Sequence, residues 1–148
     1  MKLFQIEEPD GSPVDPDAPG AAIGIDVTGS QAEVAIAIGG NAALLNDRDG
    51  FEVDLTVPVS TADVPEWQML LELARLRAER GLARPVTHVV VVADPAACER
   101  LQGGAAEAGL VLLRTVTPEE LPAAEKRALA AAVLAEDLAP SPQRGLTG

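Results

Sequence analysis

The residues with the clearest chemical potential lie where an apolar segment ends at an acidic side chain. Asp26 follows the apolar run AAIGI and precedes the polar turn Thr28-Gly29-Ser30. Exposed N–H groups of a tight turn can bind phosphate oxygens, and a neighbouring carboxylate can hold a hydrated Mg²⁺ ion. We therefore treat this turn as a candidate phosphate-binding site in which Asp26 contacts a metal ion through water. The alternative is structural, because a turn-forming Asp also bonds its own backbone.

Two further carboxylates follow apolar segments in the same way. Asp94 comes directly after THVVVVA, and Glu120 follows LVLLRTV after a short polar stretch. Both have a structural interpretation, since Asp94 fits the N-cap of a helix and Glu120 fits the acid of a capping box. Together with Asp26 they also form the kind of carboxylate set that holds two metal ions in a hydrolytic site.

The lone histidine and the lone cysteine are expected to be structural. His88 begins an apolar strand, and Cys98 falls on the inward stripe of a predicted helix, where a buried thiol is inert. With one cysteine no intramolecular disulfide can form, and no Cys or His pair has zinc-ligand spacing.

Charge narrows the classes of partner. The formal net charge of the 148 residues is −12, which argues against nucleic acids and anionic membrane surfaces because both are bound through cationic side chains. An acidic surface favours solubility and can attract a basic protein partner. The N-terminus lacks a secretory h-region and the apolar runs are too short to span a membrane, so a cytoplasmic location is expected.

The chain divides into three parts by composition. Residues 1–20 are rich in Pro, Asp and Gly and are expected to form a flexible leader. Residues 139–148 resemble a frayed tail, and residues 21–138 form the single predicted domain. Within that domain the apolar period alternates between that of strands and that of helices. Strands are expected at 21–27, 33–40, 43–47, 87–94 and 110–116, and helices at 63–81, 94–109 and 117–138.

The order of these elements predicts the fold class. Three strands joined by turns give an antiparallel meander, and the later strands return through helices as right-handed parallel crossovers. Residues 51–59 alternate in hydropathy and are either a fourth strand of the meander or an extended crossover. The β-β-β-α-β-α-β-α order predicts an α/β, ribonuclease-H-like, three-layer domain with a mixed five-stranded sheet and helices on both faces.

Two stretches resemble one lobe of the superfamily that unites actin, sugar kinases and heat-shock ATPase chaperones. IGIDVTGSQAEVAIAIGG resembles its first hairpin, and PVTHVVVVADPAACERLQGGAAEAGLVLLRTVTPEELPAAEKRALAAAVLA resembles its later strands and helices. The resemblance implies that Asp26 faces the water shell of a metal–phosphate complex, with ATP and Mg²⁺ as the cofactors. Thr28 stands where the family usually has Gly, and Leu121 is inserted between Glu120 and Pro122 within the family's Glu-Pro element.

The family closes ATP between two such lobes, and this length accommodates one. We therefore expect a non-catalytic interaction or regulatory protein with a degraded phosphate turn, acting on a protein partner or through self-association. Two alternatives remain at this point. One is a nucleotide-binding protein whose site is completed by dimerisation or by a partner chain. The other is a metal-dependent ribonuclease-H-like nuclease that uses Asp26, Asp94 and Glu120.

Overall fold

The computed structural model describes residues 20–45, 55–121 and 126–139. The predicted leader apart from Gly20, and the predicted tail apart from Ala139, lie outside these residues. The described strands are β1 (Ala21–Asp26), β2 (Glu33–Ile38), β3 (Asn41–Leu44), β4 (Val86–Val92) and β5 (Val111–Val116). The helices are α1 (Val64–Leu82), α2 (Cys98–Glu107) and α3 (Arg127–Leu138).

The five strands form one mixed sheet in the order β3-β2-β1-β4-β5. β1, β2 and β3 pair as an antiparallel meander, whereas β4 is parallel to β1 and β5 is parallel to β4. The prediction of an α/β fold with a mixed five-stranded sheet is therefore confirmed. β4 lies at the centre of the parallel part, and its last four valines are buried because helices cover both of its faces.

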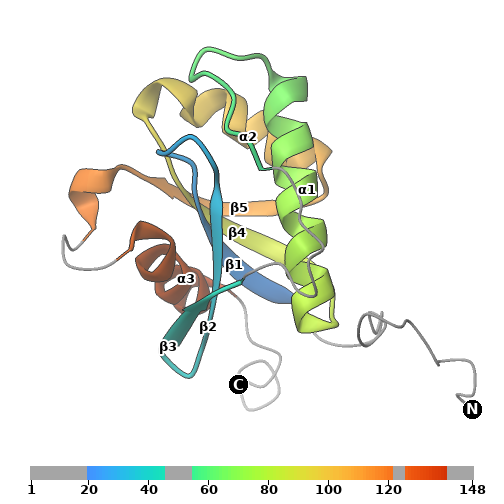
Figure 1. Ribbon diagram of the computed structural model, residues 1–148, viewed down its shortest axis with the longest axis vertical. Coiled ribbons are helices and arrows are strands. Elements are labelled where there is room, and N and C mark those ends of the chain that lie inside the picture. The colour runs from blue at the N-terminus through green and yellow to red at the C-terminus, as the bar shows by residue number, and fades with distance from the viewer. Residues whose placement is uncertain (1–19, 46–54, 122–125, 140–148) are drawn as a thin grey trace, which may run out of the picture.

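The helices divide between the two faces of the sheet (Figure 1). Ile23, Ile25 and Val89 point to the face that α1 and α2 cover, where they join the larger apolar cluster. The intervening positions point to α3, so that Gly24 contacts this helix and Val90 packs against it. Strand alternation thus decides which side chain reaches which layer.

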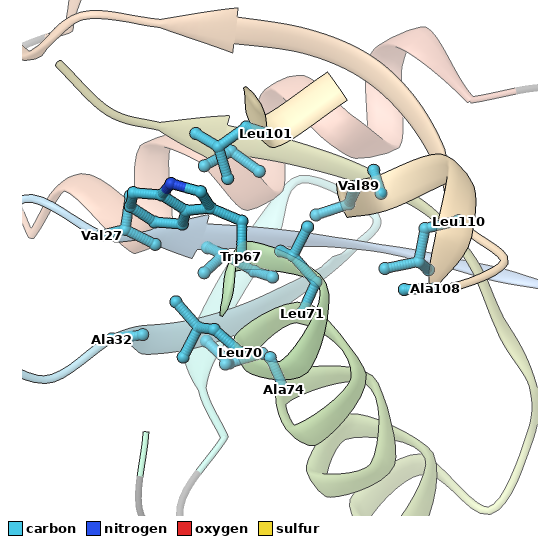
Figure 2. Packing of buried hydrophobic residues seen from close by; sticks show 14 of the residues in the cluster. Val27, Ala32, Trp67, Leu70, Leu71, Ala74, Val89, Leu101, Ala108 and Leu110 are labelled. Carbon is cyan, nitrogen blue, oxygen red and sulfur yellow. The ribbon is translucent and has the colours of Figure 1, made fainter. Parts of the chain in front are cut away.

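α1 anchors the larger cluster through Trp67, whose side chain is 1% exposed (Figure 2). Its indole ring lies beside Val27 and Leu101, which come from the end of β1 and from α2. α2 can approach α1 closely because Gly104 has no side chain. A Cβ atom there would lie 2.9 Å from the backbone N of Gln68. Gly104 therefore serves helix packing and does not interrupt α2.

Four local predictions were wrong. The third strand was predicted at 43–47, whereas β3 spans Asn41–Leu44 and so begins two residues earlier. The predicted helix at 117–138 is split, because the capping box of Thr117 and Glu120 opens a 3-10 turn and α3 begins only at Arg127. Gly81 does not end α1, which continues to Leu82 and is closed by Ala83 in the left-handed conformation, with φ 58°. Cys98 is only partly buried, at the first residue of α2.

The segment that links β3 to α1 is described from residue 55 onward. Within 55–59 there is no strand beyond one antiparallel bridge between Thr56 and Gln31, so this part is an extended crossover. Leu55 is buried and ties the crossover to the core. Among the described residues, no helix combines the length and the apolar character that a membrane crossing requires.

Candidate functional site

The carboxyl ends of β1, β4 and β5 meet at one edge of the sheet. The backbone N–H of Val27 donates to the carbonyl of Val92 over 2.9 Å, and the N–H of Ala93 donates to Val116 over the same distance. The loops that follow these three strands are therefore neighbours. In open α/β sheets ligands bind outside the carboxyl ends of the strands, so this edge is the candidate site.

The Asp26 carboxylate is engaged by its own turn. Its Oδ1 accepts hydrogen bonds from the backbone N of Thr28 at 2.9 Å and from the Thr28 hydroxyl at 2.6 Å. The same hydroxyl accepts a hydrogen bond from Arg127 Nη1 at 3.1 Å. This is the self-bonded Asp turn, and Arg127 of α3 extends it into a chain of three side chains.

The other residues of the predicted phosphate turn are exposed. Gly29 and Ser30 lie at the surface, and the carbonyl of Ser30 accepts a hydrogen bond from the N–H of Val57 at 2.9 Å. The side chain of Gln31 donates to the Thr56 hydroxyl and accepts from the N–H of Leu55. The crossover thus holds the far side of the turn by several hydrogen bonds.

A cavity of about 340 Å³ opens beside this turn, on the face that α1 and α2 cover. Its walls combine polar and apolar surface, with Thr28, Ser60 and Asp94 as its hydrogen-bonding side chains apart from the indole of Trp67. Asp26 does not line it, because strand alternation turns this side chain toward α3 while Val27 faces the cavity. The described lining is Val27, Thr28, Gly29, Val57, Pro58, Ser60, Trp67, Ala93, Asp94, Ala97 and Pro118.

The electrostatics of the cavity wall do not favour a phosphate. None of the described lining residues is basic, and Asp94 places a carboxylate at the wall. Arg127 contacts Thr28 but is not part of the lining. A multiply charged anion would therefore enter without a cation to offset its desolvation.

The three strand-end carboxylates are not assembled into a metal site. Glu120 closes the capping box with Thr117 and pairs with Arg114 at 3.2 Å, while Asp94 is exposed at the start of the 3-10 turn before α2. Over the described ranges, no group of three His, Cys, Asp or Glu side chains could hold a metal ion.

His88 and Cys98 have structural surroundings. The Nδ1 atom of His88 lies 2.7 Å from the Thr87 hydroxyl, and the Sγ of Cys98 lies 3.7 Å from the carbonyl oxygen of Asp94. Neither side chain lines the cavity.

Sequence reasoning missed two α3 side chains that tie this helix to distant turns. Arg127 reaches the turn that follows β1 (residues 26–30, here called the β1 turn). Glu136 accepts hydrogen bonds from the backbone N of Gly39 at 2.7 Å and of Gly40 at 2.9 Å. The Gly39-Gly40 pair was recognisable as a turn signal. Nothing in the helical pattern distinguishes Glu136 from a solvated acid, since its partners lie about a hundred residues away.

No protein-family model matches the chain, and no curated protein matches it at a significant level.

Proposed function

We propose that the chain is a cytoplasmic, non-catalytic interaction or regulatory protein, ribonuclease-H-like in fold and related to one lobe of heat-shock-chaperone and actin-like ATPases. The observation that carries the proposal is the closed β1 turn. The N–H and the hydroxyl of Thr28 both donate to Asp26, and Arg127 donates to that hydroxyl.

A phosphate turn needs donors that are directed at the ligand. Hydrogen bonds to a charged acceptor contribute about 1.5–3 kcal/mol, so turning the Thr28 N–H toward a phosphate would forfeit a favourable bond to Asp26. Phosphoryl transfer depends almost wholly on positioning and electrostatic stabilisation. The Asp26 carboxylate is hydrogen-bonded within its own turn, and the described cavity wall has no basic residue. This edge of the sheet therefore lacks both the positioning and the electrostatic stabilisation that phosphoryl transfer needs.

The strand order supports the fold relation. An antiparallel β3-β2-β1 meander that continues through parallel β4 and β5 is what the ribonuclease-H-like prediction requires. The surface supports an interaction role, because large apolar side chains are exposed on β2, on the crossover before α1, on α1 itself and on β5. Those with half or more of their surface exposed are Ile38, Val59, Met69, Leu76 and Val111.

The test is nucleotide turnover and binding by the purified full chain. We expect no Mg²⁺-dependent ATP hydrolysis and no saturable heat on titration with Mg-ATP, and Asp26→Ala should behave like the wild type. Turnover at about 1 per second or faster, abolished by Asp26→Ala, would overturn the proposal.

The cavity at the carboxyl ends of β1 and β4 favours one second candidate, a nucleotide-binding protein whose site is completed by dimerisation or a partner chain. A partner would have to supply the cations that the described wall lacks. Micromolar Mg-ATP binding that rises with protein concentration and is lost in Asp26→Ala would favour this candidate. The dispersed carboxylates give the nuclease alternative no comparable support.

A further inference from the structure

The outward face of α1 has five side chains at a regular spacing. Glu66, Met69, Leu73, Leu76 and Arg80 follow one another at intervals of 3, 4, 3 and 4 residues. This is the 3.5-residue spacing of a coiled-coil seam, so the five side chains lie along one stripe of the helix. We call this stripe the α1 seam.

The centre of the α1 seam is apolar and largely outside the core. Met69 is 63% exposed and Leu76 is 50% exposed, and Leu73 is partly buried where it packs against the edge of the larger cluster. The core-facing side of α1 is a different stripe, formed by buried residues that include Trp67 and Leu71. α1 therefore packs against the core of its own domain with one face and exposes a second apolar stripe to solvent.

The ends of the α1 seam carry opposite charges. Glu66 lies in the first turn of α1 and Arg80 in the last, each seven residues from Leu73. An antiparallel copy of the same helix, crossing at Leu73, would place each Glu66 against the Arg80 of the other copy. A parallel copy would place like charges together, so the charges select one orientation.

We propose that the α1 seam is the interface of a symmetric homodimer, in which two copies pair antiparallel about a two-fold axis near Leu73. The pattern is self-complementary, as an isologous contact requires, because the acidic end meets the basic end at both places. Met69 of one copy packs near Leu76 of the other. This inference rests on the proposed interaction function and names its partner as a second copy of this chain.

The size of the seam sets the expected strength. From Glu66 to Arg80 the helix extends about 21 Å, which is short for a permanent interface. We therefore expect a reversible, concentration-dependent dimer with a dissociation constant on the order of 10–100 µM. The net charge of −12 adds a general repulsion, so moderate salt should strengthen the association until the two ion pairs are screened.

The experiment is sedimentation equilibrium of the full chain over about 5–500 µM, with charge-swapped variants. Glu66→Arg and Arg80→Glu should each weaken the dimer about tenfold, because each places like charges at both ends of the seam. An equimolar mixture of the two variants should form a heterodimer with near wild-type affinity, since one end of its seam keeps the native ion pair and the other end regains an ion pair with reversed polarity. Circular dichroism checks that each variant is folded.

Glu107→Arg is the matched control, because it makes the same charge change at an exposed position of α2 away from the seam. It should leave the dissociation constant within about twofold of wild type. A wild-type chain that stays monomeric over the whole range, or variants whose mixture fails to recover affinity, would overturn the dimer. Neither result would affect the proposed non-catalytic role, which the ATP measurements decide.

Discussion

The two faces of the sheet are held by different kinds of packing. On one face α1 and α2 contribute large side chains, with Trp67, Leu71 and Leu101 filling the space above β1 and β4. On the other face α3 contributes alanines, and the helix backbone comes so near to β1 that a Cβ on Gly24 would collide with Ala131 and Ala132. The α1/α2 layer is packed by large side chains that fill the space above the sheet. The α3 layer is packed by small residues that let the helix backbone approach the sheet closely.

The two faces also differ in their polar contacts, because α3 supplies side chains that hydrogen-bond to the turns before and after β2. Arg127, the first residue of α3, donates a hydrogen bond to Thr28. Glu136, in the last turn of α3, accepts hydrogen bonds from the backbone of Gly39 and Gly40. A helix that lies close to the sheet can reach turns at both ends of β2 with ordinary side chains.

The largest effect on stability is expected from removing a large buried side chain on the α1/α2 face. Trp67→Ala should lower the free energy of unfolding by about 4 kcal/mol, since a fully buried aromatic side chain is replaced by a cavity. Urea denaturation followed by circular dichroism measures it. Trp67→Phe should cost much less, because it keeps a ring and removes an indole N–H without a hydrogen-bond partner among the described residues. Equal losses in the two variants would contradict this account.

The next largest effect on stability is expected from adding a side chain on the α3 face, where the helix backbone lies close to the sheet. Gly24→Ala should destabilise the protein by about 3 kcal/mol, because the added methyl meets the backbone of α3 and cannot be accommodated by a side-chain rotation. Gly29→Ala is the matched control, since its nearest neighbour to the new Cβ is the carbonyl oxygen of Gln31 at 3.8 Å. If the two alanine variants had similar denaturation midpoints, close packing of α3 would not be the organising feature of this face.

Disconnecting α3 from the β2–β3 hairpin should have a smaller effect. Glu136→Gln leaves one acceptor oxygen for two backbone donors and removes the charge, so a loss of about 1 kcal/mol is expected. Hydrogen exchange should accelerate at the amides of Gly39 and Gly40. Asp137→Asn makes the same charge change at the next, exposed residue and should alter neither quantity. Unchanged exchange in Glu136→Gln would show that the carboxylate does not hold the turn.

The sequence contained enough information for the sheet and for one of its faces. β4 was recognisable because a run of valines without polar alternation fits a strand covered on both sides. α1 was recognisable because Trp67, Leu70, Leu71, Ala74 and Ala78 repeat with a helical period, and these are its buried residues. The mixed five-stranded sheet follows from that order of elements, while its ribonuclease-H-like relation stays a prediction.

The face covered by α3 and the candidate site were harder to predict, for physical reasons. α3 is rich in alanine on its buried side and elsewhere, so its buried residues give no strong periodic signal in the sequence. The capping box at Thr117 indicated a helix start, but it belongs to a 3-10 turn. The polar turn after Asp26 was located correctly. Its closure depends on Arg127, about a hundred residues away, and contacts of that range have no local sequence signature.

The smallest effect is expected to have the opposite sign and tests whether glycine is needed everywhere in this fold. Gly81→Ala lies within α1, and its new Cβ would make an ordinary contact with Leu45 Cδ2 at 3.7 Å. Alanine is favoured over glycine inside a helix by up to about 1 kcal/mol, so this variant should be stabilised by about 0.5 kcal/mol. Differential scanning calorimetry should show a slightly higher melting temperature. A destabilised Gly81→Ala would mean that the end of α1 is also close-packed, and the contrast between the two faces would have to be redrawn.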